Sequence, residues 1–121
     1  MGIVWHGSYA LYFEDARETF GARYGLDYLS IFRAGLYTPL VDLEFHYKRP
    51  ITYGTNPQIT ITYVPTEAAK IIFNYVITDG QTGEIIATGR SVQVFLNEKR
   101  ELLWISPDFY ENWKKEWKVN I

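Results

Sequence analysis

The sequence predicts an α+β fold in which one long helix lies against a single antiparallel sheet. Apolar residues recur at helical spacing over the first part of the chain, and apolar and polar residues alternate in four later segments. Short turn-rich connections, such as the one with two glycines over residues 79–83, join consecutive segments as hairpins. These observations place the helices together on one face of one sheet.

The long helix is expected over about residues 8–24, with end errors of a few residues. Ser8 is a candidate N-cap, because its hydroxyl can accept a hydrogen bond from an amide of the first turn. Gly25 follows the helical pattern and suits the C-cap. The apolar stripe consists of Tyr9, Tyr12, Phe13, Ala16, Phe20 and Tyr24, and charged residues occupy the other side.

The remaining elements follow in order along the chain. A short helix is expected over residues 26–35, with Asp27 as its cap and Gly35 as its stop. Period-two alternation predicts strands over residues 41–48, 59–63, 69–78 and 84–96. Gly89 inside the last of these strands indicates a bulge or a close approach by another backbone. A short strand over 102–105 and a helix over 107–118 complete the order.

Composition limits the possible function classes. A chain of 121 residues is expected to form one domain. Its net charge of −2 gives no field that attracts nucleic acid or an anionic membrane. No cysteine is present for a disulfide, a thiolate nucleophile or a cysteine zinc site, and the two histidines stand far apart, so no metal site is expected. No apolar run of ~18 residues and no signal peptide is found, so we expect a cytoplasmic protein.

Two adjoining motifs identify a family. The segment GIVWHGSY over residues 2–9, followed by YFEDAR over 12–17, closely resembles the 4-hydroxybenzoyl-CoA thioesterase-like branch of the hotdog-fold acyl-CoA thioesterases. The resemblance continues through TPLV at 38–41, YKRP at 47–50, YG at 53–54 and ATGR at 87–90. It implies a hotdog fold, in which a curved antiparallel sheet wraps a long central helix.

The resemblance also implies where the catalytic carboxylate belongs. In that family an aspartate lies on the loop three residues before the glycine that matches Gly2, and a strand precedes the loop. Both positions fall before Met1. We therefore expect residues 1–121 to form a hotdog domain without its first strand, and this form to hydrolyse thioesters weakly.

Thioester hydrolysis needs a group that polarises the carbonyl and a group that activates water. The unpaired amides at His6 and Gly7, reinforced by the helix dipole, can stabilise a developing oxyanion, and the resemblance puts the thioester carbonyl on the amide of His6. Within the chain the candidate bases are His6, with an ordinary pKa of ~6.5, and Glu14, about two turns into the helix. The alternatives are a packing role for His6 and an i,i+3 ion pair with Arg17 for Glu14.

The substrate needs an apolar pocket and cations for the phosphates of coenzyme A. Trp5, Tyr9 and Tyr12 lie beside the predicted helix start and are expected to line the pocket, whereas Phe13 is assigned to the core. Lys70, Arg90 and Ser91 are the candidate phosphate contacts. The alternative is that these are ordinary solvated side chains.

The sequence thus predicts an acyl-CoA thioesterase that uses no cofactor besides the coenzyme A of its substrate and works as a homodimer or homotetramer. One alternative is a hotdog protein that binds acyl-CoA without catalysis. Another is a hotdog enoyl-CoA hydratase or dehydratase. Assays of thioester cleavage and of enoyl-CoA hydration separate the three.

Overall fold

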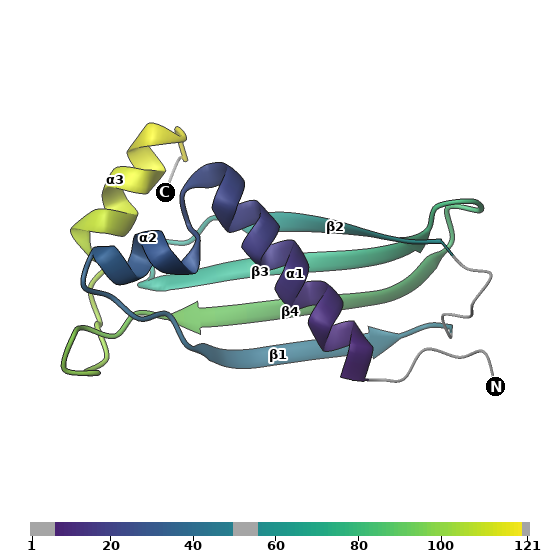
Figure 1. The fold of residues 1–121 in the computed structure, drawn as a ribbon, viewed down its shortest axis with the longest axis horizontal. Coiled ribbons are helices and arrows are strands. Elements are labelled where there is room, and N and C mark those ends of the chain that lie inside the picture. The colour runs from purple at the N-terminus through teal and green to yellow at the C-terminus, as the bar shows by residue number, and fades with distance from the viewer. Residues whose placement is uncertain (1–6, 50–55, 120–121) are drawn as a thin grey trace.

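The computed structural model describes residues 7–49 and 56–119, and side chains from Tyr12 onward. A four-stranded antiparallel sheet carries the long helix across one face, and the two shorter helices lie at one end of the sheet (Figure 1). The elements are α1 (Gly7–Tyr24), α2 (Tyr28–Arg33), β1 (Leu40–Tyr47), β2 (Pro57–Val64), β3 (Lys70–Asp79), β4 (Ile85–Val94) and α3 (Asp108–Glu116). The predicted α+β layout is therefore confirmed.

The strands are ordered β1-β4-β3-β2. Hairpins join β2 to β3 and β3 to β4, whereas β1 pairs with the last strand in the sequence, β4. Among the described residues, β1 and β2 are thus the two edges of the sheet.

The core lies between α1 and the sheet. Along β3, alternate residues face the helix, and Ile71, Phe73, Tyr75 and Ile77 are each at most 2% exposed. The ring of Phe13 from α1 is completely buried and stacks on Phe45 and Tyr75, at centroid distances of 5.1 and 4.4 Å. The predicted core role of Phe13 is confirmed.

Gly89 lies under this ring. A Cβ atom added there would come within 2.3 Å of the Phe13 ring and 2.9 Å of the Glu44 carbonyl oxygen. The register through Gly89 is regular, and the shifts in the ladders fall at Leu40/Asp42 and Ile77/Thr78. Of the two alternatives predicted for Gly89, the bulge is wrong and the close approach of another backbone is confirmed, together with the close approach of an aromatic ring.

The C-cap of α1 and the N-cap of α2 agree with the sequence predictions, whereas the N-terminal end of α1 differs. Gly25 has φ +82° and donates its N–H to Gly21 O, as expected for a C-cap. Asp27 caps α2 by accepting from the Ser30 backbone N–H and from the Ser30 hydroxyl, and chiefly the hydroxyl hydrogen bond lowers the pKa of Asp27 below its ordinary value. The predicted N-cap Ser8 is wrong, because α1 already includes Gly7.

Helix α3 is fastened to α1 and to β2. The Trp113 indole N–H donates to the Tyr24 carbonyl at 2.6 Å, and the hydroxyls of Tyr63 and Tyr110 lie 2.5 Å apart. Burial raises the pKa of both tyrosines. A buried Lys114 donates to the Thr66 carbonyl at 2.8 Å.

Two strand expectations need correction. The predicted strand over 102–105 is absent from the described structure except for one isolated bridge between Leu96 and Leu102, and Trp104 and Ile105 are 86% and 84% exposed. In β1, Leu43 and Phe45 are half-buried, but Val41 and Tyr47 are exposed. β1 lies at the edge of the described sheet, where Phe45 stacks on Phe13 of α1 and the two ends of the strand are more exposed.

Candidate functional site

The start of α1 carries the predicted carbonyl-binding amides. Gly7 is the first residue of the helix, so its N–H is among the four that have no intrahelical acceptor. His6 and Trp5 lie outside the described residues, and the side chain of Tyr9, although within α1, also lies outside the description. Their predicted roles therefore stay predictions.

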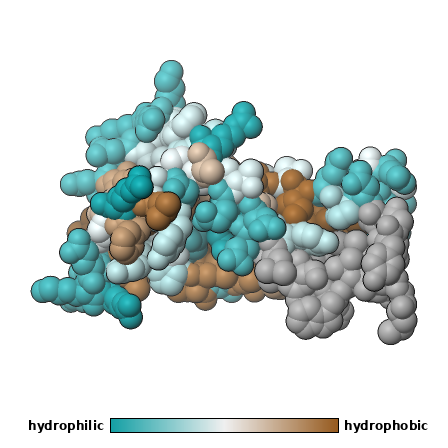
Figure 2. Space-filling model, in the orientation of Figure 1, coloured by the Kyte–Doolittle hydropathy of each residue, from teal (hydrophilic) through white to brown (hydrophobic). Residues whose placement is uncertain are grey.

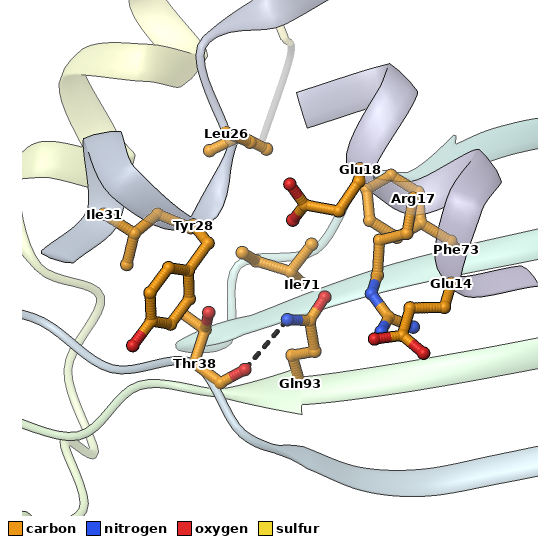
Figure 3. A pocket seen from close by; sticks show the side chains of 10 residues that line it. All are labelled: Glu14, Arg17, Glu18, Leu26, Tyr28, Ile31, Thr38, Ile71, Phe73 and Gln93. Carbon is orange, nitrogen blue, oxygen red and sulfur yellow. Dashed lines mark hydrogen bonds between the residues drawn. The ribbon is translucent and has the colours of Figure 1, made fainter. Parts of the chain in front are cut away.

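A cavity of about 290 Å³ lies between α1, α2 and the sheet (Figure 3). One wall is a charged strip of α1, and the other consists of apolar side chains from α2, β3 and the loop between the first two helices. The residues that line it are Glu14, Arg17, Glu18, Leu26, Tyr28, Ile31, Thr38, Ile71, Phe73 and Gln93. A charged wall facing an apolar wall can hold a small acyl group and orient a water molecule beside it.

Of the predicted site residues whose side chains the structure describes, Glu14 alone lines this cavity. It stands seven residues after Gly7, which returns it to nearly the same face of α1 at a rise of roughly 10 Å. The described residues form no ion pair between Glu14 and Arg17. The contact expected if Glu14 served only in a surface ion pair is therefore missing.

The floor of the cavity is held by a polar contact between distant segments. Gln93 of β4 donates its side-chain N–H to the Thr38 carbonyl at 2.8 Å, which fixes the amide and leaves its oxygen available as an acceptor (Figure 3). Tyr28 from α2 lines the same cavity with its ring, while its hydroxyl points away from the other lining side chains (Figure 3). The Gln93 oxygen can accept a hydrogen bond from a bound ligand.

Tyr12 lies on the other flank of α1. It lines a separate groove of about 570 Å³ between α1 and the edge strand β2, together with Asp15, Ala16, Thr19, Phe20, Arg23, Tyr24, Pro57, Ile59 and Ile61. Phe13, buried between the two flanks, separates this groove from the cavity at Glu14. The structure therefore does not bring Tyr12 together with Glu14.

The three predicted phosphate contacts are also separated. Lys70 and Arg90 are both exposed and lie on the sheet face away from α1, with Lys70 opposite Val94 and Arg90 four residues earlier on β4, roughly 13 Å away along the strand. Ser91 points the other way, is fully buried and bonds the Tyr75 hydroxyl at 2.6 Å. Ser91 is thus wrongly assigned as a phosphate contact, because adjacent residues of a strand face opposite sides of the sheet.

Sequence reasoning missed most of the cavity lining. Arg17 and Glu18 share the face of Glu14 by i,i+3 and i,i+4 spacing respectively, a signal that the sequence contains. Thr38 opens the TPLV motif that carries part of the family resemblance. The roles of Gln93 and Tyr28 depend on tertiary contacts and left no sequence signal.

The described residues offer neither a metal site nor a membrane-spanning helix. Over residues 7–49 and 56–119, no three histidine, aspartate or glutamate side chains converge as metal ligands. None of the described helices combines the length and the apolar character needed to cross a bilayer.

Comparison with known proteins places these observations in a family. The model of the Thioesterase-like superfamily matches residues 1–113. Synechocystis sp. has a similar protein, sll0410, named as a candidate esterase, which is 28% identical over 96 residues, or 79% of this chain. The match spans 58% of the length of sll0410. YneP of Bacillus subtilis, named as a candidate acyl-CoA thioesterase, is 25% identical over 82% of this chain and 71% of its own length.

A solved structure agrees with the described fold. The DHNA-CoA thioesterase from Staphylococcus aureus superposes with a TM-score of 0.80 at 26% identity, covering 99% of this chain and 83% of the other. The hotdog fold implied by the motifs is thereby confirmed. With the helix motif, the sheet order and the match over residues 1–113 in agreement, the chain belongs to the thioesterase-like superfamily.

Proposed function

We propose that the protein hydrolyses the thioester of a small acyl-coenzyme A, with the acyl group in the cavity beside α1. The observation that carries the proposal is the position of Glu14. Its carboxylate lines a cavity on the face of α1 that begins at the free amide of Gly7, in a chain of the thioesterase-like superfamily.

The chemistry follows from these two groups. The free N–H groups at the start of α1 donate hydrogen bonds to the thioester carbonyl oxygen, and the helix dipole stabilises the negative charge that develops there. Glu14 takes a proton from a water molecule as the water oxygen attacks the carbonyl carbon. The tetrahedral intermediate then collapses, the carbon–sulfur bond breaks, and the thiolate of coenzyme A takes up the proton that Glu14 holds. The products are a carboxylic acid and free coenzyme A.

The remaining parts of the proposal concern binding and assembly. Lys70 and Arg90 are proposed as contacts for the phosphates of coenzyme A, since both are exposed cations on one sheet face. No cofactor besides coenzyme A is invoked, and the homo-oligomer and the cytoplasmic location stay predictions from the sequence.

The test measures release of coenzyme A from benzoyl-CoA and hexanoyl-CoA by the 121-residue chain and its variants. Glu14→Gln keeps the shape of the side chain but removes the base, and is expected to lower kcat ~100- to 10,000-fold. Asp15→Asn is the matched control, because this neighbouring carboxylate lies on the other flank of α1 and should change kcat little. Equal activity of Glu14→Gln and the unmodified chain would exclude Glu14 as the base.

The phosphate contacts are tested separately in the same assay. The Lys70→Ala/Arg90→Ala variant is expected to raise KM roughly tenfold or more with little change in kcat, since each charge-assisted contact is worth ~1.5–3 kcal/mol. An unchanged KM at low salt would show that the two side chains are only solvated. Binding of acyl-CoA without hydrolysis, or hydration of an enoyl-CoA, would overturn the assignment as a hydrolase.

A further inference from the structure

The cavity beside α1 has a second polar end that the proposed hydrolysis does not use. Its charged wall consists of the carboxylates of Glu14 and Glu18 and the guanidinium of Arg17, and two negative charges with one positive charge leave a net charge of −1. In Figure 3, Arg17 extends on the side of Glu14, whereas the Glu18 carboxylate points to the opposite side, toward Leu26. The excess negative charge therefore lies at the Glu18 end of the cavity.

Glu18 has no basic neighbour on its own helix. The positions three and four residues away hold Glu14, Asp15, Gly21 and Ala22. Within residues 7–49 and 56–119, none of the ion pairs includes Glu18. Like charges at i,i+4 spacing, such as those of Glu14 and Glu18, destabilise a helix. A cation bound in the cavity would compensate the charge that the helix leaves unpaired.

Gln93 adds a second hydrogen-bond acceptor from the sheet. Its side-chain N–H donates to the Thr38 carbonyl at 2.8 Å, so the amide cannot turn over without losing this bond. The amide oxygen consequently faces the cavity (Figure 3). Glu18 from α1 and Gln93 from β4 thus present two acceptors to one space.

The space beside these acceptors is apolar and small. Leu26, Ile71 and Phe73 line it and are 7%, 2% and 1% exposed. The volume of about 290 Å³ suits a single ring or a short chain. From Glu14 to Glu18 the helix rises roughly 6 Å. A benzoyl group with a one-carbon arm in the para position spans about this length, so its carbonyl can lie at Glu14 while the arm reaches Glu18.

We propose that the cavity selects acyl groups that carry a terminal ammonium group, and that Glu18 and Gln93 bind this group. The inference rests on the proposed function, which puts the reacting carbonyl between the start of α1 and Glu14. The ammonium donates one hydrogen bond to the Glu18 carboxylate and one to the Gln93 oxygen. Both the charge of the ammonium and its several donors match what this end of the cavity offers, and charge-assisted hydrogen bonds are the stronger kind.

Four para-substituted benzoyl thioesters of coenzyme A test this selection. The substituents are an aminomethyl group, an ethyl group of the same shape, a hydroxymethyl group as a neutral donor, and a carboxylate. The flat ring keeps the amine away from its own thioester, so no lactam forms. We expect kcat/KM of the aminomethyl thioester to exceed that of the ethyl thioester roughly 10- to 100-fold, with the hydroxymethyl thioester between them and the carboxylate lowest.

Three variants locate the residues that are responsible. Glu18→Gln keeps the shape and removes the charge, and is expected to lower the aminomethyl-to-ethyl ratio of kcat/KM roughly tenfold. Gln93→Leu removes the second acceptor and should lower the ratio too. Asp15→Asn is the matched control, because it removes a carboxylate from the other flank of α1 and should keep the ratio. Each ratio compares two substrates on one protein sample, so the fraction of folded protein cancels.

Binding of thioethers keeps this inference separate from the proposed hydrolysis. S-[4-(aminomethyl)benzyl]-CoA and S-(4-ethylbenzyl)-CoA contain no thioester, so isothermal titration calorimetry on them measures selection alone. We expect the aminomethyl thioether to bind roughly tenfold or more tightly, and this advantage to disappear in Glu18→Gln. Selective binding of this thioether without cleavage of any of the four thioesters would refute the hydrolysis and support the ammonium site.

Several results would overturn the inference itself. Equal affinities of the two thioethers would show that the ammonium is not bound. Equal kcat/KM for the aminomethyl and hydroxymethyl thioesters would show that its charge is not recognised. A preference for the carboxylate would assign the selection to Arg17, and a preference for the ammonium that survives Glu18→Gln would exclude Glu18.

Discussion

Gly89→Ala tests the contact that fixes α1 on the sheet. The new Cβ would lie 2.3 Å from Cε2 of Phe13 and 2.9 Å from the Glu44 carbonyl oxygen. The ring cannot retreat freely, because it is stacked on Phe45 at 5.1 Å and on Tyr75 at 4.4 Å. Overpacking of this kind typically costs ~1–3 kcal/mol, a substantial part of the ~5–15 kcal/mol that stabilises a domain.

A second substitution isolates the cause. Phe13→Leu removes the ring atoms that the new Cβ meets, at a cost below the ~3–5 kcal/mol of Phe→Ala. If the ring is responsible, Gly89→Ala should be much less costly in the Phe13→Leu background, with a coupling of ~1 kcal/mol or more. The clash with the Glu44 carbonyl remains in both backgrounds and sets the residual cost.

Urea unfolding of the four proteins of this cycle measures the coupling, with the slope against urea expected to stay constant. Additivity of the two substitutions to within ~0.5 kcal/mol would refute the reasoning. So would a Gly89→Ala variant that is as stable as the unmodified protein.

Two further predictions concern hydrogen bonds and pH. Tyr63→Phe should cost ~1–3 kcal/mol in chemical denaturation, because it leaves the buried Tyr110 hydroxyl without its partner. Burial raises the folded pKa of both phenols above the ordinary 10.0. Their contribution to the free energy of unfolding is therefore complete below pH ~10 and is lost as the pH rises from there toward the folded pKa values. The same loss of stability at alkaline pH in a Tyr63→Phe/Tyr110→Phe variant would contradict this. Asp27→Ala should cost ~0.5–2 kcal/mol at neutral pH. Since hydrogen bonding to Ser30 holds the folded pKa of Asp27 below 3.8, this difference should shrink as the pH falls through that folded pKa, and a pH-independent difference would argue against a capping carboxylate.

Local periodicity in the sequence predicted most of the fold. The stripe around Phe13 determined the buried face of α1, and the alternation from Lys70 to Asp79 determined the face of β3 that α1 covers. Both follow from the fixed geometry of helix and strand, which repeats every 3.6 or 2 residues whatever the partner is. The motif around His6 added the family, which pattern alone did not provide.

The site residue that depends on one helix alone was predictable from the sequence, whereas those that depend on contacts between elements were not. Glu14 was found because helix phase relates it to Gly7 within one element. Ser91 was assigned wrongly, and Tyr12 lines a different groove from Glu14, because one step along a strand or a helix moves a side chain to another face. Gln93 was missed because its contact joins residues 55 positions apart in the sequence.

By itself, then, the sequence determined the order and type of the elements, the buried face of α1 and the family, because each depends on residues close together in the chain. Only the tertiary structure decided that Phe13 separates two hollows, that Glu14 and Gln93 share one of them, and that β1 lies at an edge. Those facts depend on which strand lies beside which. The chain sets that order through long-range packing, such as Phe13 over Gly89, and not through local propensity.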